Sequence, residues 1–335
     1  MELRLVEVTV PAARRAALEA VLEEQGSLTS WTAAAVEGDA VLARALLPAG
    51  RTEGVLDDLQ RAVAESELQV VVLPVSASIP RVEEDEADAA VDADDESDAP
   101  PERVAREELY GEIAGSVRRS PAKLAMVLLS AAVAAAGLLM DDVAIVIGAM
   151  VIAPLLGPNV ALALATTLAD TDLARRAFLA AGTSVVLVVT LATAIGLAIP
   201  VDPDSAQIAA RTRLGFGHLA LALAAGSAGA LAFTTGVSAS LIGVMVAVAL
   251  LPPLTAFGLL LGAGLPGPAA GAGLLAIGNL ICINLAGVVT FLAQGIRPRR
   301  WWEAERAKRA SRLAIVVWGA LLLALALVIR FSRGG

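Results

Sequence analysis

Prolines interrupt two long apolar runs of this sequence, and amide or hydroxyl side chains lie beside them and in a third run. A proline removes one backbone donor and clashes with the preceding helical turn, so it leaves polar backbone groups without helical partners. Inside a bilayer such groups must face protein or a wet cavity, where they can coordinate an ion or bind a small polar solute. The candidate residues for this chemistry are Pro154, Gly157, Pro158, Asn159, Pro252, Pro253, Thr255, Asn279 and Asn284.

The two proline-containing runs share a motif. Residues 147–158 read IGAMVIAPLLGP and residues 242–253 read IGVMVAVALLPP, with seven of twelve positions identical at an offset of 95. The matched Gly, Met and Pro residues carry the similarity, because the whole chain has only five Met. The alternative is two apolar helices that are alike through composition alone. A true repeat predicts two copies of one structural unit, with their broken helices meeting near the bilayer midplane.

Each candidate residue also has a structural alternative. A proline kink is tolerated in many membrane helices for packing alone. Asn279 and Asn284 are five residues apart, which places them roughly 140° apart around a helix rather than on one face. Their alternative role is hydrogen bonding between helices, which is common among small residues in membranes.

Ionisable side chains are nearly absent from the apolar runs. Asp141 and Asp142 follow the first run and His218 opens the fourth. A proton-coupled carrier usually keeps a carboxylate or histidine at depth, so the pattern favours coordination by carbonyls and amides, or a passive pore. The sequence shows no Ser/His/Asp set, no His/Cys cluster with metal-ligand spacing and no phosphate loop. We therefore expect no enzyme activity, no metal site and no cofactor.

Composition predicts an integral membrane protein. The mean hydropathy is +0.73 and only 3% of residues are aromatic. Residues 1–101 carry 22 acidic and 7 basic side chains, whereas residues 102–335 carry 12 acidic and 18 basic ones. This acidity argues against a nucleic-acid partner. The single cysteine, Cys282, excludes a disulfide framework.

Residues 1–80 predict a small α+β domain. Alternating polar and apolar residues predict the strands, and apolar residues at helical spacing predict the helices. Their order, β-α-β-β-α-β, is that of a ferredoxin-like fold. The chain opens without a contiguous apolar stretch typical of a signal peptide, so we expect this domain on the cytoplasmic side. The expected strands are 2–10, 28–36, 40–47 and 69–75, and the expected helices are 11–26 and 51–65.

Two connecting segments follow. Residues 81–101 predict a disordered acidic linker, since ten of the sixteen residues from 83 to 98 are acidic; a cation-binding or regulatory tail is the alternative. Residues 102–121 predict an amphipathic helix at the membrane interface. Its apolar stripe is Leu109, Tyr110, Ile113 and Val117.

The rest of the chain predicts about seven transmembrane segments, with a core at 122–300 and an interfacial segment plus a final span at 301–335, anchored by Trp301 and Trp302. A spanning 143–168 segment puts Arg118, Arg119, Arg175 and Arg176 on the cytoplasmic side, whereas a re-entrant one moves the last two outside. The positive-inside rule favours spanning. Each repeat then holds three crossings, so the second copy is inverted. The expected segments are 122–140, 143–168, 178–199, 218–234, 237–262, 270–294 and 313–329.

Four separated blocks resemble one family of bacteria and archaea, the uncharacterised hydrophobic domain of unknown function 389. They are EELYGEI (107–113), LLMDDVAIVIGAMVIAPLLGP (138–158), SLIGVMVAVALLPPLTAFGLLLGAG (240–264) and NLICINLAG (279–287), and the resemblance covers about 102–300. It implies an integral protein of a bacterial or archaeal inner (cell) membrane, often with a small N-terminal soluble domain. It implies no particular activity.

Two functions are compatible with these features. The first is a membrane transporter or channel for an ion or small solute, with its site at the proline-broken helices near the midplane. The second is a membrane-anchored ligand sensor or oligomerisation scaffold, with the ferredoxin-like domain as the binding module. Surfaces rich in Gly and Ala predict a homo-oligomer in the lipid bilayer, most simply a dimer.

Overall fold

The computed structural model divides the chain into two compact units, Met1–Gly111 and Glu112–Gly335. It describes residues 3–24, 29–33, 39–64, 66–75, 104–235, 239–296, 312, 315–327 and 330. The predicted acidic linker at 81–101 and the predicted anchor at Trp301 and Trp302 therefore lie outside the described residues. Side chains of 239–248 are also outside the description, although the backbone there is helical.

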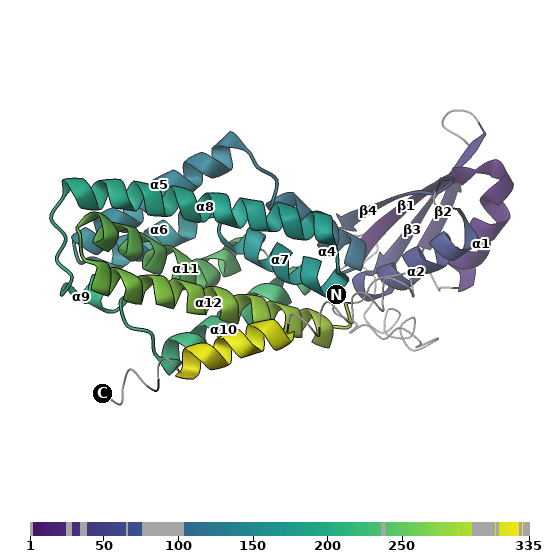
Figure 1. Ribbon diagram of the computed structural model, residues 1–335. Helices are drawn as coiled ribbons and strands as arrows, with labels where there is room; N and C mark the ends of the chain where they lie inside the picture. The colour runs from purple at the N-terminus through teal and green to yellow at the C-terminus, as the bar shows by residue number, and fades with distance from the viewer. Residues whose placement is uncertain are drawn as a thin grey trace. The chain divides into compact units, whose positions relative to one another are not determined.

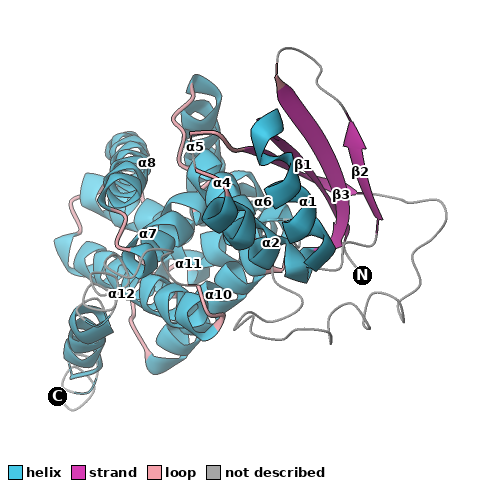
Figure 2. Cartoon of the chain, turned by 90° about the vertical axis from the view of Figure 1, so that its right-hand side faces the viewer, coloured by secondary structure: helices cyan, strands magenta, loops and turns pink. Residues whose placement is uncertain are grey.

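The first unit is a four-stranded antiparallel sheet with helices packed on it (Figures 1 and 2). The strands lie in the order β2-β3-β1-β4, and the order of elements along the chain is the predicted β-α-β-β-α-β. The elements are β1 (Leu3–Pro11), η1 (Ala12–Arg14), α1 (Arg15–Glu24), β2 (Thr29–Ala33), β3 (Ala40–Pro48), α2 (Ala49–Ala62) and β4 (Gln69–Val75).

Strict alternation along β1 builds the core of this unit. Val6, Val8 and Val10 are buried on one face, where they meet apolar side chains of the two helices such as Leu18 and Leu59. Successive side chains of a strand point to opposite faces, so this two-residue period sends one face to the helices and leaves the other for polar residues. The period is what made these strands predictable.

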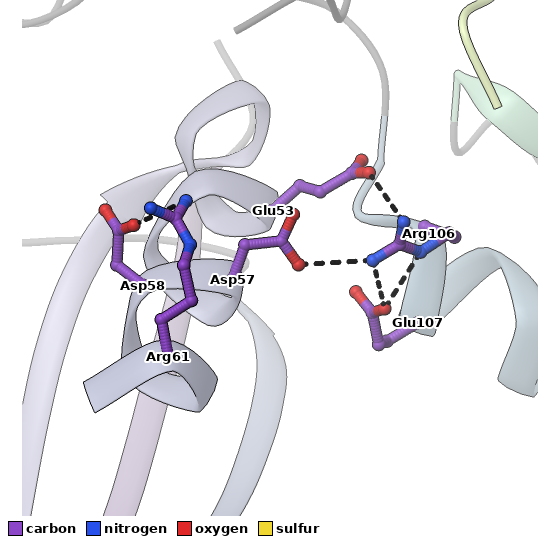
Figure 3. Close-up of polar contacts among 6 residues, drawn as sticks. All are labelled: Glu53, Asp57, Asp58, Arg61, Arg106 and Glu107. Atoms are coloured by element: carbon purple, nitrogen blue, oxygen red, sulfur yellow. Dashed lines mark hydrogen bonds and ion pairs between the residues drawn. The ribbon is translucent and has the colours of Figure 1, made fainter. Parts of the chain in front are cut away.

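Helix α4 (Arg106–Ser116) begins in the first unit. Arg106 is buried there, and its Nη2 atom lies 3.2 Å from Asp57 Oδ1 and 3.1 Å from Glu107 Oε1, while its Nη1 atom lies 3.9 Å from Glu53 (Figure 3). Three carboxylates compensate the buried guanidinium, because a charge removed from water needs paired, hydrogen-bonded partners. The helix is shorter than the predicted 102–121: it ends at Ser116, and Pro121 begins a separate helix that Ser120 caps.

The second unit is helical (Figure 1). Its longest helices are α8, α11 and α12, and α8 packs against α11 while α12 packs against α7, α10 and α11. The helices are α5 (Pro121–Leu139), α6 (Val143–Ile152), α7 (Leu156–Leu168), α8 (Thr171–Ala198), α9 (Ala206–Ala209), α10 (Phe216–Thr234), α11 (Ala239–Gly262) and α12 (Pro266–Ala293).

Among the described residues, four helices are long and apolar enough to cross a bilayer, namely α5, α8, α10 and α12. The bent pair α6 and α7 makes a fifth if both belong to one span. The apolar stretches Ala249–Gly262 and Ile315–Leu327 are shorter. Four to five membrane-compatible helices are thus established, and the predicted count of seven stays a prediction.

Helix starts differ from the predicted span starts. α8 begins at Thr171, seven residues before the predicted 178, and the Asp170 carboxylate caps it by accepting from the Leu173 amide at 2.9 Å. The first turns of α8 contain the charged residues Arg175 and Arg176, so the predicted apolar segment did not include them. Capping signals locate a helix end where hydropathy locates only its apolar portion.

Candidate functional site

The first proline-containing run is broken into two helices. α6 ends at Ile152, Ala153 is extended (φ −70°, ψ 116°), and α7 starts at Leu156 with its axis bent by 54° from that of α6. Pro154 explains the break, because the ring disfavours helical geometry at the preceding residue and removes a donor. Pro158 lies in the first turn of α7, where an amide has no helical acceptor anyway, so it is compatible with the helix. The predicted break is therefore at Pro154.

Asn159 and Gly157 shape the start of α7. Asn159 is only 4% exposed; its Nδ2 donates to the Leu155 carbonyl at 2.8 Å, and its Oδ1 is buried with no hydrogen-bond partner among the described residues. A Cβ added to Gly157 would lie 2.6 Å from Ser116 Oγ. Glycine at 157 thus lets the end of α4 lie directly against the break.

The second proline-containing run is not broken, which corrects the expectation of two broken segments. α11 continues from Ala239 to Gly262 with Pro252 and Pro253 inside it. Pro253 has no amide to offer the Ala249 carbonyl four residues earlier. The Asn279 Nδ2 atom of α12 donates to that carbonyl at 2.6 Å. A neighbouring helix supplies the missing donor, and this is the bond between helices that was the alternative role for Asn279.

The remaining two candidates bond within their own helices. Thr255 Oγ1 donates to the Leu251 carbonyl at 2.9 Å, and Asn284 Nδ2 donates to the Leu280 carbonyl at 3.0 Å. Both residues are buried. Like Asn159, however, Asn279 and Asn284 each keep a buried Oδ1 that has no partner in the described part of the chain. Three asparagines of α7 and α12 therefore hold amide oxygens available to a ligand or water.

The packing of α7 on α12 puts Asn159 and Asn284 on neighbouring helix surfaces. A Cβ added to Gly287 would lie 2.8 Å from the Ala163 Cβ. Ala163 comes four residues after Asn159 and Gly287 three residues after Asn284, so each asparagine is about one helical turn from this contact. The structure brings these two candidates to one interface.

A cavity of about 30 Å³ lies at the first break. Its apolar wall includes both prolines of the broken run, and polar side chains of α4, α5 and α8 complete it. Ser184 was not among the predicted site residues, although it lies 95 residues before the candidate Asn279, the same offset that separates the two proline motifs. The lining includes Ser116, Arg118, Arg119, Lys123, Pro154, Pro158, Thr183 and Ser184.

Comparison with known proteins gives a family and one full-length relative. Residues 150–285 match the model of a family described as domain of unknown function (DUF389). An uncharacterised protein of Methanocaldococcus jannaschii is 36% identical over 329 residues, which cover 98% of this chain and 99% of that protein. No solved structure matches.

Proposed function

We propose a transport function for this chain, which belongs to the DUF389 family: it is a membrane transporter or channel for an ion or small solute. The observation that carries the proposal is the break between α6 and α7. Beside it, the buried Oδ1 of Asn159 has no hydrogen-bond partner among the residues that the structure describes. Neutral amide and carbonyl oxygens in a low-dielectric interior can coordinate a small cation or accept hydrogen bonds from a polar solute. Asn284 and Asn279 extend this set of oxygens along α12.

Helix lengths support two copies of one three-helix unit. α5 and α10 both have 19 residues, and they start 95 residues apart, at Pro121 and Phe216. α8 and α12 both have 28 residues, and they also start 95 residues apart, at Thr171 and Pro266. The pair α6 and α7 then corresponds to α11. The same offset aligned the sequence motifs.

The direction of α11 supports an inverted second copy. A Cβ on Gly258 would lie 2.8 Å from the Val189 carbonyl oxygen, and one on Gly262 would lie 2.9 Å from the Leu197 amide. The residue numbers of these contacts increase in the same direction along both helices, from 189 to 197 in α8 and from 258 to 262 in α11. The two helices therefore run parallel. α7 and α8 are joined by a tight turn at Ala169, which makes them antiparallel neighbours. α11 therefore runs opposite to α7, its counterpart.

Reciprocal close contacts are consistent with a two-fold relation between the copies. A Cβ on Gly258 would lie 2.6 Å from the Ala192 Cβ, and one on Gly287 would lie 2.8 Å from the Ala163 Cβ. Adding 95 to Ala163 and Ala192 gives Gly258 and Gly287. A rotation that exchanges the copies therefore turns the first contact into the second, as an inverted repeat requires.

Topology is testable with single cysteines, because Cys282 is the only native one. In a Cys282→Ala background we expect Thr171→Cys and Pro266→Cys, at the exposed starts of α8 and α12, to face opposite sides of the membrane. An impermeant maleimide should label one in right-side-out vesicles and the other in inverted vesicles. Labelling of both from the same side would contradict the inversion.

Flux measurements test the transport proposal itself. Purified full-length protein in liposomes is expected to conduct at least one member of a panel of alkali cations and small polar solutes. Asn159→Leu, which removes the buried amide, should lower that flux about tenfold or more, since an interaction of 1.4 kcal/mol corresponds to a factor of ten. Thr166→Ala, on the same helix with its hydroxyl bonded to the Leu162 carbonyl, is the matched control and should leave flux unchanged. Folded protein that conducts none of the panel would overturn the proposal.

A cavity in the first unit favours the ligand-sensor alternative. It measures about 300 Å³ and has apolar walls from Leu56, Leu68, Val70 and Val72, with Gln60 and Glu107 at its polar side. That size is at the lower end of small-molecule sites. A sensor of this kind would have the ferredoxin-like unit on the cytoplasmic side of a homodimer. Ligand-dependent thermal stabilisation without flux would favour it over transport.

A further inference from the structure

We propose that the cavity at the first break binds a phosphate-type oxyanion, either the headgroup of an anionic lipid or free phosphate. This site is separate from the proposed transport function, because it depends on the charges around the cavity and not on what crosses the membrane. Three cationic side chains, Arg118, Arg119 and Lys123, line the cavity, and the described residues of its lining include no acidic side chain. All three lie within residues 118–123: the two arginines follow α4, and Lys123 is in the first turn of α5.

Lys123 is held in place at this cavity. Its ammonium donates to the Gly115 carbonyl at 3.1 Å and to the Ser116 carbonyl at 2.7 Å. An ammonium has three donors, so one remains for a ligand. Arg118 and Arg119 are exposed, and within the described ranges no acidic partner lies within ion-pairing distance of either guanidinium. Guanidinium groups recognise phosphate through paired hydrogen bonds.

The start of α7 adds a positive electrostatic contribution. Pro154 and Pro158, which flank that start, both line the cavity. Leu155 occupies the N-cap position and provides no side-chain hydrogen bond. The first amides of a helix have no acceptor within the helix, and the helix dipole favours an anion beside them. The uncapped helix start and the three cations thus border the same space.

The hydroxyl groups in the lining and the small volume of the cavity limit the class of ligand that it can bind. Thr183 and Ser184 line the cavity from α8, and each donates to a carbonyl of its own helix, at 2.6 Å and 3.0 Å. A hydroxyl rotates easily and can redirect its proton to an oxyanion. A volume of about 30 Å³ holds one or two water molecules. It can therefore admit one or two oxygens of a phosphate group whose remainder faces the opening, but not a whole metabolite.

The test compares two arginine pairs in the full-length protein. Arg118→Gln/Arg119→Gln removes the cavity pair, and Arg175→Gln/Arg176→Gln removes an equal charge from an exposed pair in α8 that does not line the cavity. Nanodiscs of phosphatidylcholine receive inorganic phosphate in one arm, and nanodiscs of equal parts phosphatidylcholine and phosphatidylglycerol form the other. The thermal midpoint gives the apparent affinity, and native mass spectrometry counts retained lipid.

We expect at least one probe to stabilise the wild type and the α8 pair variant, and the cavity pair variant to bind it about tenfold or more weakly. Stabilisation by phosphatidylglycerol alone identifies a lipid headgroup, and stabilisation by phosphate alone identifies the free ion. Arg118→Lys/Arg119→Lys, which keeps the charge, should retain part of the affinity and guards against a folding defect. Equal losses in the two Gln pairs, or no response of the wild type to either probe, would overturn the site.

Discussion

Replacing Asn279 by leucine is expected to destabilise the helical unit by about 1–3 kcal/mol, the cost of a buried polar group left unsatisfied. The group is the Ala249 carbonyl, which Pro253 cannot satisfy and which the Asn279 amide now bonds at 2.6 Å. No water is available in a hydrocarbon interior to take over this bond. Thermal unfolding in nanodiscs should show the loss as a lower midpoint, by roughly 2–4 °C per kcal/mol for a domain of this size.

Two further variants separate this cause from a general packing defect. Asn284→Leu is the matched control, because its amide donates to the Leu280 carbonyl of its own helix, which the backbone amide four residues later also serves; we expect a smaller loss. Pro253→Ala in the Asn279→Leu background restores an amide for Ala249 and should recover most of the midpoint. If Asn279→Leu costs as much with alanine at 253 as with proline, the compensation does not exist.

Replacing Gly196 by alanine is expected to disrupt the packing of α8 on α11. A Cβ there would overlap the Leu259 carbonyl oxygen, a backbone atom that cannot rotate away. The two helices would have to separate, and overpacking of this kind costs about 1–3 kcal/mol and occasionally more. The expected result is a lower yield of monodisperse protein by size-exclusion chromatography and a lower thermal midpoint.

Gly182→Ala on the same helix is the control. A Cβ at Gly182 would meet no atom of the described residues within 4 Å. Since alanine favours helix over glycine by up to about 1 kcal/mol, this variant should be neutral or slightly stabilising. Equal tolerance of alanine at both positions would show that α8 and α11 are not in close backbone contact.

The sequence was informative wherever a local rule decides the structure. The two-residue period of Val6, Val8 and Val10 identified β1, and the backbone donor that Pro154 removes identified the break, because both depend only on neighbouring residues. The expected break at Pro253 was wrong because the outcome there depends on a residue that is distant in the sequence. The donor that keeps α11 continuous is on Asn279, and no local pattern shows that the two residues meet.

Other features also depend on tertiary packing. The motif led to the proposal of a helical repeat, but the parallel course of α8 and α11 follows from contacts of Gly258 and Gly262 that composition does not reveal. Arg118 and Arg119 were interpreted only as topology markers, and Lys123 was not among the candidate residues. Their place around a cavity with Pro154 became apparent once α4, α5 and α7 were seen together.

The bond between Asn279 and the Ala249 carbonyl also limits the order in which mutations can accumulate. A helix that acquires Pro253 first leaves the carbonyl of the buried Ala249 without a donor, whereas an asparagine acquired first can bond its own helix, as Asn284 does. Asparagine at 279 is therefore the permissive change and proline at 253 the dependent one. Lineages that lose the amide are expected to have lost the proline already, or to carry another donor facing the same carbonyl.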